Sequence, residues 1–220
     1  MAQANPRKLN HRTRDFIAHM RDGYRSIKGK PPKHTLRTTI TRPESPARPT
    51  YKFDVNSVTA EEWTLLEQLV REAASFDGPI VEVGVLAGGT TQRIAAVKAP
   101  KQKIIAVDNF CWNGWGFTPE EHWSLVQLSL SYLVRTQQVE IMKMDKNVFF
   151  EQYSGPAPAL VFVDAMHDYE ETKKDLVWAK SVGAKIICGH DYCEDFPGVM
   201  KIVDEMGGPK RLAGSLFMIQ

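Results

Sequence analysis

The chain has 220 residues, of which 43% are hydrophobic and 25% are charged. These values are typical of a soluble globular protein, and no apolar run is long enough to span a membrane. The first residues lack the apolar segment of a signal peptide. Three scattered cysteines are too few for a disulfide framework or a zinc knuckle. We therefore expect a cytoplasmic protein without a membrane partner.

The net charge of +2 is unevenly distributed along the chain. Residues 1–50 hold 12 Lys and Arg against 3 Asp and Glu, a net charge of +9, whereas the remainder holds 16 against 23, a net charge of −7. Residues 12–27 are predicted to form a helix with one apolar face, and the five prolines within residues 31–50 predict a linker. This basic arm could bind nucleic acid, an anionic surface or a sister subunit in a homo-oligomer. A solvated extension is an equally good interpretation.

Residues 51–220 are predicted to form one domain in which helices and strands alternate. Ser57 or Thr59 can cap a first helix that ends near Ala74. Strands are expected over 80–83, 103–108, 139–144, 159–164, 184–188 and 215–219, and further helices over 90–98, 119–134, 147–153, 169–181 and 198–206. This alternation predicts an α/β fold with a doubly wound, mostly parallel sheet. In such sheets, ligands bind beyond the carboxyl ends of the strands.

The strongest local signal lies in residues 79–91, where a buried strand runs into a glycine-rich turn and then a helix that begins near Thr90. This geometry lets the backbone approach a nucleotide-like ligand closely. Gly84 is followed by three other residues before Gly88, so the G-x-G-x-x-G dinucleotide motif is absent. Glu82 lies inside the apolar strand, where a carboxylate needs a partner.

Acidic residues follow several of the predicted strands. Asp108 lies 24 residues beyond Gly84, at a position suited to the hydroxyls of a ribose. Asp145 follows the third strand, where it could either contact the ligand or cap the next helix. Any one such acid is a common turn or cap residue, but acids after four strands of one sheet favour a binding site.

A second group of polar residues lies in the segments 164–170 and 189–192. Asp164 closes one strand, and His190 and Asp191 close the next. Because adjacent strands lie roughly 5 Å apart, these side chains can meet around one ion. Two carboxylates and an imidazole suit a divalent cation, Mg²⁺ in the first place and Mn²⁺ as an alternative. His167, in the loop above, could act as a general base.

These motifs resemble a known enzyme family. The pattern Glu82-x-Gly84-x-x-x-Gly88 with Asp108 resembles the class I S-adenosylmethionine-dependent methyltransferases. The segments Val163-Asp-Ala-x-His-x-Tyr-Glu170 and Gly189-His-Asp-Tyr192 are similar to those of the metal-dependent O-methyltransferase branch, which includes macrolide-sugar O-methyltransferases and cephalosporin hydroxylase-like proteins. The resemblance covers about residues 55–219 and implies a Rossmann-like fold. One difference is His190, where some relatives carry Glu or Asp.

The resemblance also implies roles for individual residues. It implies that Asp164 and Asp191 bind the divalent cation, that His190 either binds the cation as well or supports the other two ligands, and that His167 is the catalytic base beside Asp164. It further implies an S-adenosylmethionine site that comprises Glu82, Gly84, Gly88, Thr90, Asp108, Asn109 and Asp145.

The expected activity is methyl transfer to a hydroxyl of a small molecule, such as a sugar, a phenol or a polyketide-like compound. Five aromatic residues could form a lid over the acceptor: Phe110, Trp112, Trp115, Phe117 and Trp123. Two alternatives stay open. One is a nucleic-acid methyltransferase that uses the basic arm, although no Asn-Pro-Pro-Tyr-type motif is present. The other is a non-catalytic binding or assembly protein on the same fold.

Overall fold

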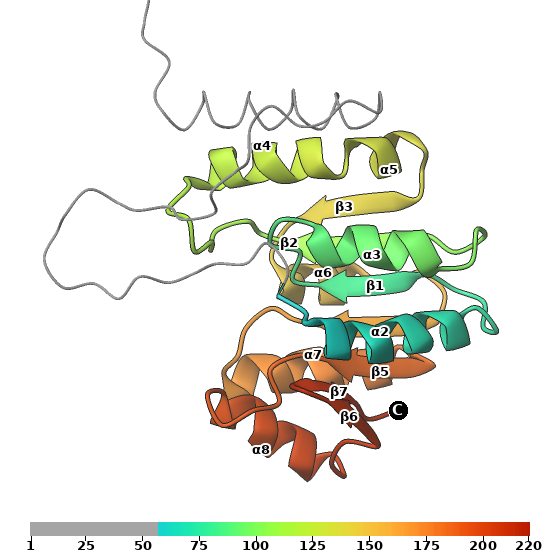
Figure 1. The fold of residues 1–220 in the computed structure, drawn as a ribbon, viewed down its shortest axis with the longest axis vertical. Helices are drawn as coiled ribbons and strands as arrows, with labels where there is room; N and C mark the ends of the chain where they lie inside the picture. Colours follow the sequence, from blue (N-terminus) through green and yellow to red (C-terminus); the bar gives the residue numbers. More distant parts are fainter. Residues whose placement is uncertain (1–56) are drawn as a thin grey trace, which may run out of the picture. The chain divides into compact units, whose positions relative to one another are not determined.

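The computed structural model describes residues 57–220 (Figure 1). The basic arm, the helix predicted over 12–27 and the linker predicted over 31–50 lie outside the described residues. The described part contains a seven-stranded sheet of order β3-β2-β1-β4-β5-β7-β6. Its strands are β1 (Ile80–Val83), β2 (Ile104–Asp108), β3 (Val139–Lys143), β4 (Leu160–Val163), β5 (Ile186–Gly189), β6 (Arg211–Ala213) and β7 (Leu216–Met218). The first five strands pair in parallel, and β7 is antiparallel to both β5 and β6.

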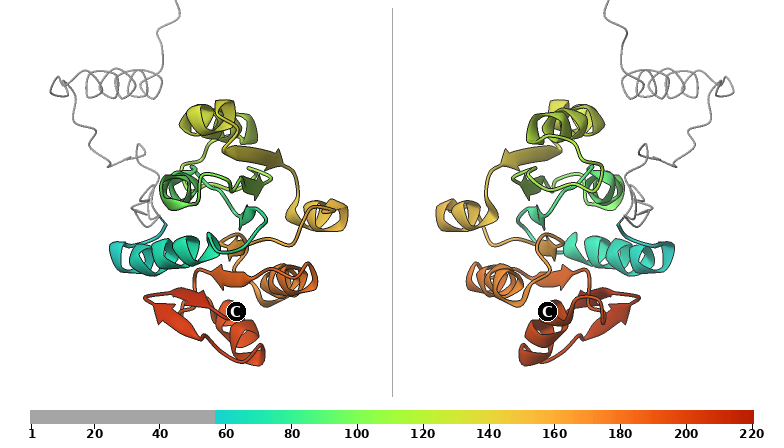
Figure 2. Two further views of the ribbon diagram at one scale, coloured as in Figure 1. Left: turned by 90° about the vertical axis from the view of Figure 1, so that its right-hand side faces the viewer. Right: turned by 90° about the vertical axis from the view of Figure 1, so that its left-hand side faces the viewer.

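Helices cover both faces of this sheet (Figure 2). One face carries α2 (Ala60–Ala73), α3 (Gly89–Val97), α4 (Pro119–Ser129) and α5 (Ser131–Arg135), and the other carries α6 (Lys146–Gln152), α7 (Tyr169–Ser181) and α8 (Pro197–Glu205). Alternate strand residues enter two separate cores: Ile80 packs with the α2 side, whereas Val81 and Val83 pack with the α7 side. The predicted doubly wound α/β fold is therefore confirmed. No helix between residues 57 and 220 is both long and apolar enough to cross a membrane.

Two parts of the predicted fold differ from the structure, although the start of the first helix is as expected. The first helix begins as expected, because Thr59 and Glu62 form a reciprocal capping box. The single helix predicted over 119–134 is wrong, since the chain breaks at Leu130 into α4 and α5. The side chain of Leu130 is fully buried against the glycine turn at Gly88. The last strand, predicted over 215–219, is the second half of a hairpin whose first half, β6, was not predicted.

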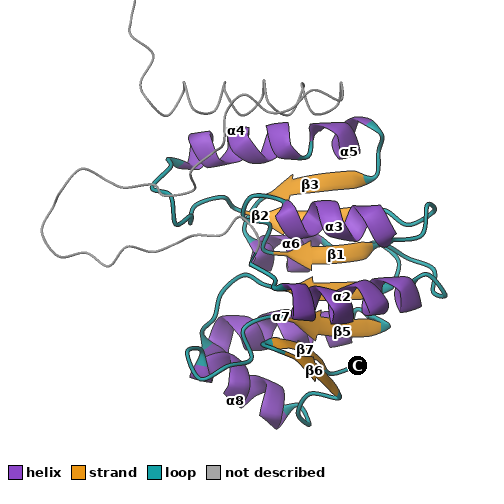
Figure 3. Cartoon of the chain, viewed as in Figure 1, coloured by secondary structure: helices purple, strands orange, loops and turns teal. Residues whose placement is uncertain are grey.

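The register of the parallel strands brings the candidate residues to one edge of the sheet. Val83 pairs with Val107 on one side and with Val163 on the other, and Val163 pairs with Gly189. The residues that follow these positions therefore leave the sheet side by side, and Figure 3 shows their loops at the carboxyl ends of the strands. The chain order also reverses between β1 and β4. This topological switch point is where open α/β sheets bind ligands.

Candidate functional site

The glycine turn after β1 is shaped by its contact with the end of β4. Gly84 has a φ of +97°, and a Cβ atom built on it would lie 2.0 Å from the carbonyl oxygen of Asp164. Gly88 has a φ of +80° and lies against Leu130. Gly84 must be glycine, because a Cβ there would clash with backbone, whereas a side chain at Gly88 would need a left-handed backbone and a shift of Leu130. The turn and the Asp164 segment are thus in direct backbone contact.

Glu82 is fully buried beneath this turn. The hydroxyl of Thr91, in α3, donates a hydrogen bond of 2.6 Å to Oε2 of Glu82, which supplies the partner that the sequence left open. Oε1 has no hydrogen-bond partner among the described residues. Burial raises the pKa of Glu82 to about 8; the Thr91 hydrogen bond opposes this rise, and the charges of Asp164 and Asp108 add to it.

Asp108 holds the loops at the ends of β1 and β2 together. Its Oδ2 accepts hydrogen bonds from the backbone N–H groups of Val85 (2.9 Å) and Leu86 (3.2 Å), and its Oδ1 accepts one from Phe110 (2.7 Å). A carboxylate offers about four lone pairs, so three are used within the protein. No described residue uses the remaining one, on Oδ1, where a ribose hydroxyl could bind. The predicted ribose contact stays a prediction.

The other residues of the predicted cofactor set have local structural roles. Asp145 caps α6 by accepting a hydrogen bond from the N–H group of Asn147, as its alternative interpretation predicted. Asn109 accepts a hydrogen bond from the N–H group of Cys111. Thr90 is buried in the first turn of α3. All three residues lie at the same edge of the sheet, and their binding to a ligand stays a prediction.

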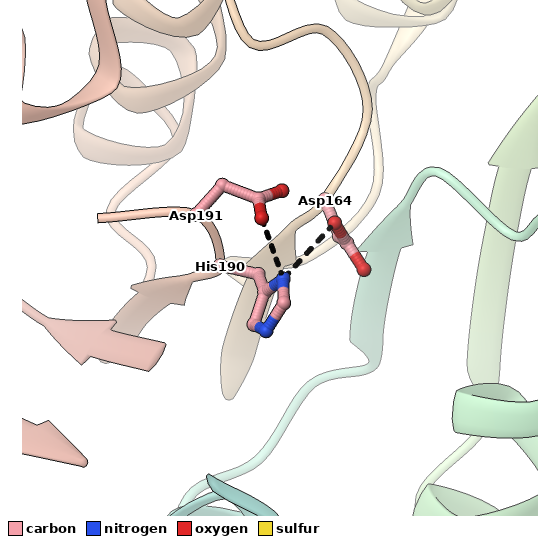
Figure 4. Close-up of side chains that lie close together, drawn as sticks. All are labelled: Asp164, His190 and Asp191. Atoms are coloured by element: carbon pink, nitrogen blue, oxygen red, sulfur yellow. Dashed lines mark ion pairs between the residues drawn. The ribbon is translucent and has the colours of Figure 1, made fainter. Parts of the chain in front are cut away.

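Asp164, His190 and Asp191 form a compact cluster beside the glycine turn (Figure 4). One potential ligand atom from each residue lies within 4.8 Å of the others. Nδ1 of His190 lies 3.1 Å from Oδ1 of Asp191 and 3.7 Å from Oδ1 of Asp164. The expectation that these three side chains meet is thus correct. Asp191 has a φ of +67°, which belongs to the left-handed region.

The opposite nitrogen of His190 faces a second polar pair. Nε2 of His190 lies 3.3 Å from Oε2 of Glu62 and 3.1 Å from Oγ of Ser215. Burial alone would raise the pKa of Glu62, but hydrogen bonds from Thr59 and Ser215 lower it to about 2. Burial likewise opposes a charge on His190, yet Asp191, Asp164 and Glu62 raise its pKa to about 9. His190 is therefore a cation between carboxylates at neutral pH.

His167 contacts the same cluster from the loop after β4. Its Nε2 lies 2.9 Å from Oδ2 of Asp191 and 4.0 Å from Oδ1 of Asp164, and its ring packs on Phe196. Burial disfavours the charged ring, but Asp191 outweighs this effect and raises the pKa of His167. Burial also opposes the charge of Asp191, whose pKa is nevertheless held low by the two histidines. Burial raises the pKa of Asp164.

The aromatic lid is only partly consistent with the structure. Phe110 is fully buried and packs against Trp123 and His122, so it is a core residue rather than a lid residue. Trp123 packs against the same core. Trp112 is 65% exposed, and the partly buried rings of Trp115 and Phe117 contact each other. A lid would thus be formed by the loop between residues 112 and 117.

Three contributors to the site were missed in the sequence. Glu62 caps α2 and also accepts hydrogen bonds from Ser215, which lies in the turn between β7 and the unpredicted β6. Ser57 donates a hydrogen bond of 3.1 Å to Oδ2 of Asp164 across 107 positions of sequence. No local pattern reveals such contacts, because they form only when distant segments fold together.

No protein-family model matches the sequence, and a search of curated proteins finds no match. Solved structures with a similar fold include a proposed O-methyltransferase from Klebsiella pneumoniae (TM-score 0.56, 21% identity, 72% of this chain and 73% of that one). They also include the O-methyltransferase TomG from Streptomyces achromogenes, in complex with S-adenosylmethionine (0.53, 15%, 91% and 79%). A proposed rRNA methylase from Clostridium thermocellum is a third (0.51, 13%, 72% and 86%). These similarities show that the chain has the fold of class I S-adenosylmethionine-dependent methyltransferases.

Proposed function

We propose that this chain is an S-adenosylmethionine-dependent O-methyltransferase whose acceptor is a small hydroxylated molecule. The observation that carries the proposal is the Asp164, His190 and Asp191 cluster at the switch point of a methyltransferase fold. This cluster lies against the glycine turn, because the carbonyl of Asp164 contacts Gly84. A site for a methyl donor and a site that activates a hydroxyl would then share one edge of the sheet.

The residues around the glycine turn fit S-adenosylmethionine, which carries a net positive charge. Asp108 and Asp164 lie at this edge, and Oε1 of Glu82 has no hydrogen-bond partner among the described residues. Asp108 retains one free lone pair for a hydroxyl. When bound, S-adenosylmethionine supplies a methyl group to a nucleophile. The residues of this chain would hold it through Gly84, Gly88 and the acids after β1 and β2.

The cluster also fits a divalent cation. Asp164, Asp191 and Nδ1 of His190 would hold it, and Glu62 would fix the His190 ring by accepting a hydrogen bond from its Nε2. A carboxylate behind a metal-binding histidine is a common arrangement. When bound, such a cation lowers the pKa of a hydroxyl group that it contacts. Two oxygens and one nitrogen suit Mn²⁺ as well as Mg²⁺.

We infer that His167 would take the proton of the acceptor hydroxyl. Asp191 engages its Nε2, so Nδ1 is the ring nitrogen that would receive the proton. The contact with Asp191 orients the ring and makes it more basic. Phe196 packs against the ring and restricts its rotation. His167 must be neutral before it accepts a proton, so the proposal requires activity to rise with pH around the pKa of His167.

The proposal is tested by binding measurements that need no acceptor. Calorimetry with the full chain should show binding of S-adenosylhomocysteine, and titration with Mn²⁺ should show one site that Asp164→Asn and Asp191→Asn abolish. Asp195→Asn, an exposed acid of the same loop, is the matched control and should leave Mn²⁺ binding unchanged. Absence of S-adenosylhomocysteine binding to the folded chain would rule out a methyltransferase.

Turnover then tests the base and the acceptor class. Transfer of a labelled methyl group to catechols, simple phenols and sugars should depend on His167, and His167→Ala should abolish it while S-adenosylhomocysteine still binds. If transfer instead requires RNA, and retention on RNA depends on salt and on residues 1–50, the nucleic-acid alternative holds. The fold alone does not separate these cases, since an O-methyltransferase and a proposed rRNA methylase share it.

A further inference from the structure

His122 is a buried histidine that the proposed reaction does not use. It lies on α4, is 0% exposed and contacts two backbone carbonyl oxygens. Its Nε2 lies 2.7 Å from the carbonyl oxygen of Leu86, in the glycine turn. Its Nδ1 lies 3.2 Å from the carbonyl oxygen of Phe110, in the loop after β2. One side chain thus connects α4 to the loops at the ends of β1 and β2.

The two residues that His122 contacts share a rare backbone conformation. Leu86 has a φ of +49° and Phe110 a φ of +57°, both in the left-handed region. For residues with a side chain, this conformation costs roughly 1 to 2 kcal/mol. It persists only where the surroundings hold it. Contacts to Leu86 and Phe110 are therefore needed to keep the two loops in shape.

Two side chains contact the backbone of both residues, one at the N–H group and the other at the carbonyl oxygen. Asp108 accepts hydrogen bonds from the N–H groups of Leu86 and Phe110, and His122 engages their carbonyl oxygens. We call this set of four contacts the Asp108–His122 clamp. The ring of Phe110 packs edge-on against His122 at 5.3 Å, which fills the space around the clamp.

We propose that His122 is a positioning residue that holds the two loops in the shape that binds the adenosyl part of the cofactor. This inference rests on the proposed function, because it assumes that S-adenosylmethionine lies against the glycine turn. Leu86 lies between Gly84 and Gly88, and Phe110 follows Asp108 and Asn109, so the clamp fixes the backbone on both sides of the expected site. Loops that are already ordered bind a ligand without the cost of ordering them.

Three substitutions of His122 separate its contact with Leu86 from its contact with Phe110. His122→Phe keeps a buried ring and removes both ring nitrogens, including the N–H donor. His122→Gln places an amide nitrogen near the position of Nε2 and keeps a donor for Leu86, whereas His122→Asn places one near Nδ1 and keeps a donor for Phe110. Thr118→Ala is the matched control, since it removes the N-cap of the same helix without touching either carbonyl.

The test measures S-adenosylhomocysteine binding by calorimetry in the full chain. His122→Phe should weaken binding about tenfold or more, because the loops lose the ring contacts to Leu86 and Phe110 and at least one buried carbonyl loses its donor. His122→Gln should bind more tightly than His122→Phe. The dissociation constant of Thr118→Ala should stay within about threefold of the wild-type value. Hydrogen exchange without ligand gives a second readout: amides of 85–88 and 109–111 should exchange faster in His122→Phe, and amides of β4 should not.

The outcomes distinguish this inference from the proposed function. If the wild type binds and His122→Phe binds equally well, the positioning role is overturned and the proposed function stands. The role is also overturned if Thr118→Ala weakens binding as much as His122→Phe, since loss of helix stability would then explain both. If the wild type does not bind, both proposals fail. Should His122→Phe fail to fold, His122→Gln and His122→Asn are compared with the wild type. Weaker binding by either one supports the positioning role, and wild-type affinity in both overturns it.

Discussion

Replacing Glu82 by Gln should remove one contribution to the pH dependence of the protein's stability. Glu82 is fully buried, and its pKa is raised to about 8 from an ordinary value of 4.5 because burial disfavours the charged form. The folded state therefore retains a proton that the unfolded state releases. The stability that this proton contributes is fully present below pH 4.5 and is lost as the pH rises through 8.

The shift from 4.5 to about 8 sets the size of the effect. Each pH unit within this window costs the wild type about 1.4 kcal/mol relative to a variant that cannot ionise at this position, and the full window corresponds to roughly 4 to 5 kcal/mol. Gln has nearly the same shape as Glu and can still accept the hydrogen bond from Thr91. Any change in packing or hydrogen bonding that it causes adds an offset that does not vary with pH.

Denaturation with guanidinium chloride at several values between pH 5 and pH 8.5 measures this difference. The free energy of unfolding of Glu82→Gln should rise relative to that of the wild type as the pH increases. Glu140→Gln, a substitution at an exposed acid of β3, should follow the wild type throughout. A difference between Glu82→Gln and the wild type that stays constant from pH 5 to pH 8.5 would refute the reasoning.

Three further predictions concern the cluster and the glycine turn. Glu62→Gln should weaken Mn²⁺ binding about tenfold, because the ring of His190 loses its carboxylate partner; the exposed neighbour Glu61→Gln should leave the Mn²⁺ dissociation constant unchanged. The Mn²⁺ dissociation constant of the wild type should fall about tenfold per unit from pH 6 to pH 8, because the pKa of His190 is raised to about 9 and the ion must displace its proton; a constant value over this range would contradict a role for Nδ1. Gly84→Ala should lower the free energy of unfolding by about 3 kcal/mol or more, since its Cβ would lie 2.0 Å from a backbone oxygen. Gly207→Ala has a similar φ but no neighbour within 4 Å, and chemical denaturation should show a loss of only about 1 kcal/mol.

The sequence predicted most of the fold because its signals are local. Apolar runs such as residues 80–83 and 159–164 indicated parallel strands, and Thr59, one of the two predicted caps, is the N-cap of α2. The break at Leu130 and the strand β6 were missed for a physical reason. Leu130 leaves the helix where it packs on the distant residue Gly88, and β6 is a three-residue edge strand whose pairing with β7 defines it. Neither feature has a periodic signature.

The candidate site was likewise predicted only in part from the sequence. Strand ends predicted that Asp164, His190 and Asp191 meet, because neighbouring parallel strands end together. What the sequence could not predict is the use of each lone pair. Asp108 accepts three hydrogen bonds from backbone N–H groups. Glu62 caps α2, accepts a hydrogen bond from Ser215 and contacts His190. Such assignments depend on contacts between residues up to 153 positions apart.

The contact between Gly84 and Asp164 ties the two halves of the proposed site together. The N–H group of Asp164 donates to the carbonyl of Val83 at 2.8 Å, so the end of β4 is hydrogen-bonded to the end of β1. The missing side chain of Gly84 lets the Asp164 carbonyl approach the turn. A backbone shift in the glycine turn must then move Asp164, and with it the distance to His190 and Asp191. The sheet itself thus sets the spacing between the turn and the cluster, and a methyl donor and an activated hydroxyl placed there would meet in a geometry fixed by strand pairing rather than by a mobile loop.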